Sequence, residues 1–371
     1  MIKAGLALFW ARLGSLNSLA QTREAALWRR WLGTALPSAD TMGRAFTLLD
    51  CAGLRQGIAQ VYTRLKRNKA LPPLEGFATA VLDGHETHNS YRRHCEGCLK
   101  RTIKVGASER VQYYHRNVTL MLLSEPLRLL LDLEPQRPGE DEVAAALRLL
   151  ERVLWRYPRA FELVLADGLY AGAPFINFLI DHGKHALVVL KDERRDIYQD
   201  AGGLFRERAP LKGSFRSREC QWWDEENLSS WPQVKVLMRV VRSQETWTVR
   251  RQATGQVEEL TSEWIWATTL PQRRAGVATI VRLGHKRWDI ENFGFNELVN
   301  DWHADHVYRH DQTAIEAFIL LAFLAYNLFS AWLWRNLKPA KRQSKTHEYW
   351  ARVCSAVLHQ AEIEEGKSRS P

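Results

Sequence analysis

Two short apolar runs in this 371-residue sequence end in the same dipeptide, Asp-Gly. FATAVLDG ends with Asp83 and Gly84, and FELVLADG ends with Asp167 and Gly168. Apolar runs of this length are typical of buried strands, and we expect each strand to stop at its aspartate. A turn is the simpler explanation for either run alone. The repeated pattern nevertheless predicts that two neighbouring strands present their carboxylates at one edge of a sheet.

The pattern of apolar and polar residues around these runs predicts a mixed α/β fold with several parts. Strand-like runs are followed by alternating helix and strand, which is typical of an α/β core. Val, Trp and Thr then become frequent, as in a β-rich insertion, before a helical pattern returns. The expected parts are a helical N-terminal module (1–75), the first part of the core (76–193), the insertion (194–271), the second part of the core (272–337) and a basic polar tail (338–371).

Charge and cysteine content limit the classes of protein to which the chain can belong. Lys and Arg number 52 against 42 Asp and Glu, and the net charge of +10 suits a polyanionic partner. Five cysteines, an odd number in a long chain, argue against a secreted disulfide framework and favour the cytoplasm. The stretch from Ala314 to Trp334 is long enough to cross a membrane. Its helical spacing and Glu316 favour a buried core helix, so we expect no membrane association.

A third acidic candidate, Glu291, lies in the predicted helix HKRWDIENFGF. Arg287 precedes it by one helical turn, so a helix-stabilising ion pair is the simpler interpretation and remains open. Three carboxylates from two strands and a helix would also suit one or two Mg²⁺ ions, which prefer oxygen ligands. Two such ions can activate a water or a 3′-hydroxyl on one side of a phosphodiester and stabilise the leaving oxygen on the other.

The order DGH, ADGLYAGAPF and RWDIEN, with a β-rich segment before the last motif, resembles the DDE-type transposases of bacterial insertion sequences. The resemblance extends from the N-terminus to about residue 335, and RWDIEN is its most specific part. It implies that Asp83, Asp167 and Glu291 are the catalytic residues and hold two Mg²⁺ or Mn²⁺ ions. It also implies that Arg287 contacts a DNA phosphate or orients Glu291.

The same resemblance implies a fold, a substrate and an assembly. The fold is a ribonuclease H-like mixed sheet flanked by helices, with an N-terminal helical module that binds DNA and an inserted β-rich subdomain. The substrates are double-stranded DNA at the element's terminal inverted repeats, where the enzyme cleaves, and the target DNA to which it joins the freed ends. The expected assembly is a homodimer in the bacterial cytoplasm, close to the nucleoid.

Two positions depart from the family's pattern. Gly284 stands where the family often has a tyrosine, and Leu298 stands where it often has a lysine. Lys286 and His285 are the nearby candidates for the missing positive charge, and Lys286 is also an expected DNA contact. Two other functions therefore stay open: a DNA-binding protein derived from a transposase but without catalysis, and a ribonuclease H-like nuclease that does not join strands.

The segment HETHNSYRRHCEGCLKRT, which follows the first Asp-Gly, contains a Cys-x-x-Cys motif with histidines nearby. His94, Cys95 and Cys98 are candidate ligands of a zinc ion. The alternatives are a reduced pair without a ligand, or a loop along DNA. The residues of that loop expected to contact DNA are Arg92, Arg93, Lys100 and Arg101.

Several histidines and tryptophans allow both a functional and a structural interpretation. His85 and Glu86 either position a metal ion or water near Asp83 or are simply exposed. The tract with His303, His306 and His310 is more typical of a polar surface loop than of a metal site. Six of the 15 tryptophans fall in the insertion, where core packing is favoured over contact with a DNA base; they are Trp222, Trp223, Trp231, Trp247, Trp264 and Trp266.

Overall fold

The computed structural model describes residues 1–356 apart from residues 24–25, 107 and 126; the last part of the expected tail, 357–371, lies outside the described residues. The chain divides into two compact units. Unit 1 comprises Met1–Pro72, Gly84–Tyr157 and Ile290–Pro371, and unit 2 comprises Pro73–Asp83 and Pro158–Asp289. Strand β1 (Thr79–Ser90) contributes its first residues to unit 2 and its remainder to unit 1.

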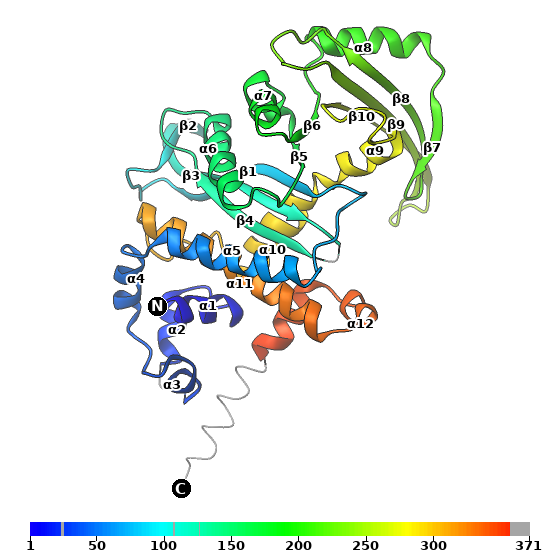
Figure 1. Cartoon of the computed structure of the whole chain (residues 1–371). Coiled ribbons are helices and arrows are strands. Elements are labelled where there is room, and N and C mark those ends of the chain that lie inside the picture. The colour runs from blue at the N-terminus through cyan, green and yellow to red at the C-terminus, as the bar shows by residue number, and fades with distance from the viewer. Residues whose placement is uncertain (24–25, 107, 126, 357–371) are drawn as a thin grey trace. The chain divides into compact units, whose positions relative to one another are not determined.

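Unit 2 is built on a mixed sheet (Figure 1). Its strands follow the order β1-β5-β6-β10-β9-β8-β7, with β1, β5 and β6 parallel and the rest antiparallel. The apolar runs LVLA and HALVV form the buried strands β5 (Leu163–Ala166) and β6 (His185–Val189). The further strands are β7 (Leu211–Phe215), β8 (Arg218–Leu228), β9 (Met238–Arg250) and β10 (Val257–Thr268), and the helices are η1 (Gly168–Tyr170), α7 (Ala173–Asp181), α8 (Asp196–Glu207) and α9 (Val277–Lys286).

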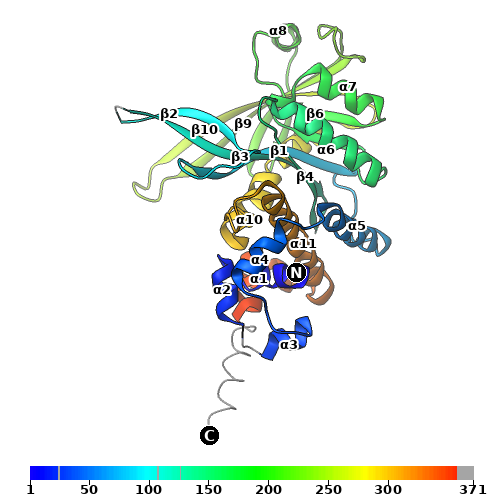
Figure 2. The same cartoon turned by 90° about the vertical axis from the view of Figure 1, so that its left-hand side faces the viewer.

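Unit 1 combines helices with a smaller group of strands, in which β3 pairs with β2 and β4 and has β1 as its other neighbour. The apolar helix α11 packs against α1, α5 and β4, and α6 covers β3 and β4. Figures 1 and 2 show α5 and α11 lying side by side. The strands are β2 (Leu99–Val105), β3 (Ser108–Leu123) and β4 (Arg128–Pro135), and the helices are α1 (Ile2–Trp10), α2 (Leu16–Gln21), α3 (Ala26–Leu32), α4 (Ala39–Phe46), α5 (Cys51–Arg67), α6 (Glu142–Arg156), η2 (Ile290–Phe295), α10 (Asn296–Trp302), α11 (Gln312–Asn336) and α12 (Pro339–Gln343).

Helix α11 is the one helix in the described part of the chain that is long and apolar enough to span a membrane. In the most apolar stretch of this helix, 83% of the residues are buried inside the protein. Asn327, in the middle of this helix, accepts a hydrogen bond from the backbone N–H of Leu130 at 3.0 Å and donates one to its carbonyl at 2.8 Å. The polar side chain is therefore satisfied by strand β4, as a buried amide must be. These contacts agree with the expected core helix.

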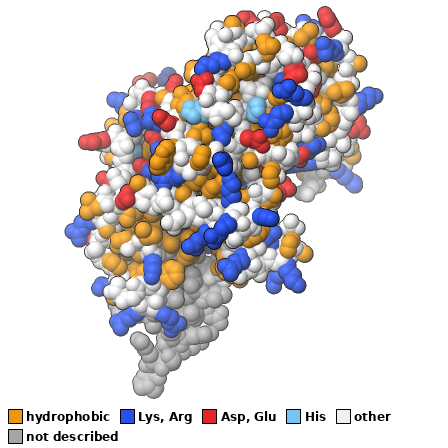
Figure 3. Space-filling view, viewed as in Figure 1, with side chains coloured by type: hydrophobic (Ala, Val, Ile, Leu, Met, Phe, Trp, Pro, Cys, Tyr) orange, Lys and Arg blue, Asp and Glu red, His pale blue; other side chains and the backbone are white. Residues whose placement is uncertain are grey.

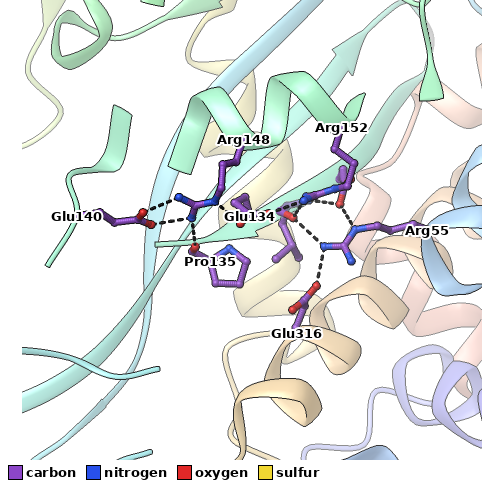
Figure 4. A network of polar contacts seen from close by, with 9 residues as sticks. Arg55, Glu134, Pro135, Glu140, Arg148, Arg152 and Glu316 are labelled. Atoms are coloured by element: carbon purple, nitrogen blue, oxygen red, sulfur yellow. Dashed lines mark hydrogen bonds and ion pairs between the residues drawn. The ribbon is translucent and has the colours of Figure 1, made fainter. Parts of the chain in front are cut away.

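A buried ionic network joins α5, β4, α6 and α11 within unit 1 (Figure 4). Asp132 on β4 is 1% exposed and accepts hydrogen bonds from Arg55 Nε at 2.7 Å and Arg152 Nε at 2.8 Å. Arg55 also donates to Glu316 on α11 at 2.6 Å and to a β4 carbonyl. A buried carboxylate needs such partners because its desolvation is otherwise unfavourable. The network fixes the N-terminal helix α5 to the strands and to α11.

The observed fold confirms the expected mixed α/β architecture with a large mixed sheet flanked by helices. One sequence expectation is wrong, because β1 does not stop at Asp83 but continues to Ser90. Its parallel partner β5 ends at Ala166, whereas β3 remains as a neighbour that supports the longer strand. Gly84 is therefore not a turn residue. A Cβ atom there would lie 2.4 Å from the carboxyl group of Glu142, so the position requires glycine for close packing.

We expect the stability of unit 1 to fall as the pH rises from about 4.5 to 7, because of Glu297. Burial raises the pKa of Glu297 to about 7, against the hydrogen bond from the Tyr326 hydroxyl at 2.8 Å. The folded protein keeps the Glu297 proton at pH values at which the unfolded chain has lost it. The stabilisation of the folded state by this proton is therefore complete below the unfolded pKa and is lost as the pH rises through the folded pKa. The loss is at most roughly 3 kcal/mol.

Urea unfolding of the wild type and Glu297→Gln at several pH values measures this effect. The amide stays neutral at every pH, so the free energy of unfolding of the variant should fall much less as the pH rises. The variant should therefore be the more stable protein at pH 8. Identical pH dependence in the two proteins would contradict the expectation.

Candidate active site

Asp83 and Asp167 are brought together by the parallel pairing of β1 and β5 in unit 2. The register pairs Leu82 with Ala166, so the two aspartates are the next residues along neighbouring strands. Neighbouring strands are about 4.8 Å apart, which places the two carboxylates within reach of common ligands. Their side chains are 16% and 28% exposed. The sequence pattern therefore identified a real juxtaposition, although one of the two strands continues past its aspartate.

Each carboxylate has a cationic partner within unit 2. Arg287 Nη1 donates to Asp83 Oδ2 at 3.2 Å, and Lys191 Nζ donates to Asp167 Oδ1 at 2.9 Å. Burial disfavours ionisation of Asp167, but the Lys191 ammonium and the Gly168 backbone N–H outweigh it and hold the pKa of Asp167 below its ordinary value. Asp167 is therefore anionic at neutral pH. These cations offset the repulsion between two adjacent carboxylates.

Lys191 is a site residue that sequence reasoning missed. It follows β6 (His185–Val189), the third parallel strand, at the end of the run HALVVLK. A Cβ atom on Gly168 would lie 3.2 Å from both the Lys191 side chain and the Val189 carbonyl. Glycine at this position leaves room for Lys191 to approach Asp167. The sequence did contain a sign of this role, because Lys191 is a polar residue directly after a third apolar, strand-like run.

Glu291 lies in unit 1, in the π-helical segment η2 between Ile290 and Phe295. π-helical turns are rare and occur frequently at functional sites, because one additional residue locally changes the direction of the side chains. The same segment ends at Phe295, whose ring stacks on His85 of β1 with centroids 4.5 Å apart. His85 is thus held in an aromatic contact. Glu86, its neighbour, pairs with Arg101 at 2.7 Å.

The donor chemistry of this region fits hard divalent cations. Adjacent, partly exposed carboxylates supply the oxygen ligands that Mg²⁺ and Mn²⁺ prefer. Asp83 and Asp167 of unit 2 are candidates for this role. Glu291 offers the same type of ligand, and its role as the third residue stays a prediction.

The departure from the family's pattern at Gly284 has a steric explanation in unit 2. A Cβ atom on Gly284 of α9 would lie 2.4 Å from the indole ring of Trp266 on β10, which is 1% exposed. The tryptophan therefore occupies the space that a larger side chain would need. His285, next in the chain, contacts Glu245 with its Nε2 at 2.6 Å. The Nε2 atom of His285 is therefore engaged within unit 2, and its role in place of the missing lysine stays a prediction.

We expect Gly284→Ala to destabilise the protein even though alanine is the better helix former. Overpacking against a buried ring costs about 1–3 kcal/mol, which exceeds the roughly 1 kcal/mol gained in helix propensity. Denaturant unfolding measures the difference. Gly202→Ala is the matched control, because Gly202 lies inside helix α8 of the same unit and a Cβ atom there meets nothing within 4 Å. Equal stability of both variants would contradict the steric explanation.

The residues expected to contact DNA have different environments. Arg287 is buried, with its guanidinium on Asp83, so in this conformation it is suited to orienting that carboxylate. Arg101 pairs with Glu86, and Lys286 lies 3.7 Å from Asp289. Arg92, Arg93 and Lys100 are exposed. Figure 3 shows Lys and Arg side chains recurring over the visible face, interspersed with acidic ones. Their DNA contacts stay predictions.

Four potential metal ligands of unit 1, which we call the Cys/His cluster, come together around the Cys-x-x-Cys turn. They are Cys95, Cys98, His115 and His310, and their ligand atoms all lie within 4.8 Å of one another. The sequence suggested His94 as a ligand, but His94 is not one of these four residues, and its ring stacks on Tyr113 with centroids 4.7 Å apart. His310 lies in the irregular connection before α11, as expected, but is only partly exposed and belongs to this cluster. His115, on β3, had no recognisable spacing from the cysteines.

The tryptophans of the insertion pack mainly in the interior of unit 2. Trp222, Trp231 and Trp266 are buried, at 7%, 7% and 1% exposure. Trp264 stacks on Trp266 with ring centroids 6.1 Å apart. These contacts agree with the favoured interpretation as core residues.

Comparison with known proteins agrees with the motifs. No curated protein matches the chain at a significant level. Residues 100–328, more than half of the sequence, match the family model of the transposase DDE domain. The match includes Asp167 and Glu291, while Asp83 lies before it. Members of this family are enzymes that act on DNA with divalent metal ions. The chain belongs to the DDE transposase family.

Proposed function

We propose that this transposase cleaves DNA at the terminal inverted repeats of a bacterial insertion sequence and transfers the freed strands into target DNA. The observation that carries the proposal is the position of Asp83 and Asp167, adjacent on parallel strands and each next to a cation. Two carboxylates are placed together in this way at a cost in repulsion, which a binding site for cations explains.

Glu291 is proposed as the third residue of the site. Two contacts, one in each unit, hold the chain to β1 on either side of it: Arg287 pairs with Asp83, and Phe295 stacks on His85. Glu291 is four residues from each of these anchors. Its place in the π-helical segment and in the part of the chain that matches the family supports this assignment.

In the proposed mechanism Asp83, Asp167 and Glu291 would hold two Mg²⁺ or Mn²⁺ ions. When bound, such ions would supply Lewis-acid stabilisation to the phosphodiester that reacts. Arg287 orients the Asp83 carboxylate, and Lys191 keeps Asp167 anionic and ready to accept a cation. Surface lysines and arginines bind the DNA phosphates, and two copies of the chain bring two element ends together.

Incubation of the protein with Mg²⁺ and duplexes that carry the inverted repeats flanking its reading frame tests this function. We expect cleaved ends and products joined to a second duplex, and none with a scrambled repeat. Light scattering of the protein–DNA complex should give two chains. Cleavage without joining would instead indicate a nuclease, and binding without cleavage a DNA-binding protein, and either outcome would refute the proposed strand transfer.

A further inference from the structure

The Cys/His cluster brings three distant segments of unit 1 to one point. Cys95 and Cys98 lie in the connection between β1 and β2, His115 is on β3, and His310 precedes α11. Cys98 and His310 are 212 residues apart in the sequence. His115 is buried and both cysteines are partly buried free thiols. A chance meeting of surface residues would not bury these groups together.

The separations between the ligand atoms match those around a tetrahedral ion. Zn–S bonds of about 2.3 Å and Zn–N bonds of about 2.0–2.1 Å imply about 3.8 Å between two sulfurs and about 3.5 Å between sulfur and nitrogen. The two Sγ atoms are 3.7 Å apart. His115 Nε2 lies 3.4 Å from Cys95 Sγ and 3.2 Å from Cys98 Sγ, and His310 Nε2 lies 3.6 Å from Cys98 Sγ.

The surroundings of the turn support ligand binding by its sulfurs. The backbone N–H of Cys95 donates to Cys98 Sγ at 3.2 Å, which orients this sulfur within the turn. A Cβ atom on Gly97 would lie 2.8 Å from the side chain of Gln312, the first residue of α11. Glycine therefore lets the turn approach the start of α11, where His310 is located.

We propose that Cys95, Cys98, His115 and His310 bind one Zn²⁺ ion in a closed, structural site. Two thiolates and two imidazoles are a ligand set that zinc prefers over Mg²⁺ or Mn²⁺. Four protein ligands fill the tetrahedron, so the site has no open position for a reacting water. The site shares no residue with the carboxylates of the proposed function, and neither proposal depends on the other.

The zinc ion would act as a cross-link within unit 1. It ties the β1–β2 connection and strand β3 to the segment between α10 and α11. A link that closes a loop of this length removes conformational freedom from the unfolded chain and so stabilises the folded one. It also fixes the end of the chain segment that follows α10.

Elemental analysis of the purified full-length protein tests the site. We expect about one zinc per chain in the wild type and an affinity at least about 100-fold lower in Cys98→Ser and His310→Gln, because loss of a direct ligand should exceed the effect of losing an outer partner. His94→Gln is the matched control, since His94 adjoins Cys95 but stacks on Tyr113. It should retain its zinc.

Replacement of zinc by Co²⁺ in the wild type gives a second readout that does not depend on variants folding. A tetrahedral site with two thiolates should give intense ligand-field bands and a sulfur-to-cobalt charge-transfer band. No zinc after dialysis against Zn²⁺, zinc retained at full affinity in both ligand variants, a cobalt spectrum without sulfur bands, or a Cys95–Cys98 disulfide in the freshly purified protein would each overturn the proposal.

Discussion

Replacing Asp167 by Asn should lower the rate of DNA cleavage by at least about 10³-fold while leaving DNA affinity nearly unchanged. Asparagine preserves the shape of the side chain but removes the negative charge and one hard oxygen ligand. The expected loss corresponds to about 4 kcal/mol or more of transition-state stabilisation, the size of effect that bound metal ions supply. DNA affinity should persist because phosphate contacts by lysines and arginines supply most of it.

Single-turnover cleavage at saturating DNA and Mg²⁺ measures the effect, and fluorescence anisotropy measures binding. Asp181→Asn is the matched control, because Asp181 also pairs with a lysine of unit 2, Lys235, but on helix α7. It should cleave at the wild-type rate. Cleavage by Asp167→Asn within about tenfold of wild type would remove Asp167 from the site. The same comparison with Glu291→Gln decides whether Glu291 is the third residue.

Replacing Arg55 by Met should lower the free energy of unfolding by about 3–5 kcal/mol, the usual cost of removing one partner from a buried ion pair. Methionine keeps much of the apolar volume but none of the three hydrogen bonds to Asp132, Glu316 and the Leu133 carbonyl. Asp132 would retain Arg152, but Glu316 would lose its guanidinium partner. The packing of α5 against β4 and α11 therefore depends on Arg55, a residue with no proposed role in catalysis.

Chemical unfolding followed by circular dichroism tests this expectation. Arg352→Met is a suitable control within the same unit, since Arg352 pairs with Glu348 on the surface and is 69% exposed. Exposed pairs of this kind contribute at most about 1 kcal/mol. A loss of similar size in both variants would show that the burial of the Arg55 network has no special weight.

Local patterns in the sequence predicted the elements of the site but not how far each extends. The two Asp-Gly runs identified neighbouring strands because a buried strand requires consecutive apolar residues, and this constraint is local. The continuation of β1 beyond Asp83 depends on its neighbour β3, which lies much later in the chain. No window of sequence around Asp83 contains that information.

The Cys/His cluster shows the same limit more clearly. The Cys-x-x-Cys turn indicated two ligands, and the adjacent His94 was the natural third. Its ring instead faces Tyr113, and the two observed histidines come from a strand and from a segment before α11. Ligands gathered by tertiary folding leave no fixed spacing in the sequence. The DNA contacts and the boundaries of the expected parts stay predictions.

The π-helical turn from Ile290 to Phe295 changes the direction in which the Glu291 side chain leaves the helix, relative to the side chains of α10. Such a turn contains one more residue than an α-helical turn, and each α-helical residue accounts for a rotation of about 100°. Deleting a single residue between Glu291 and α10 would restore α-helical register and swing the carboxylate by about that angle. The direction of the Glu291 side chain therefore depends on the number of residues between it and α10 as well as on their identity.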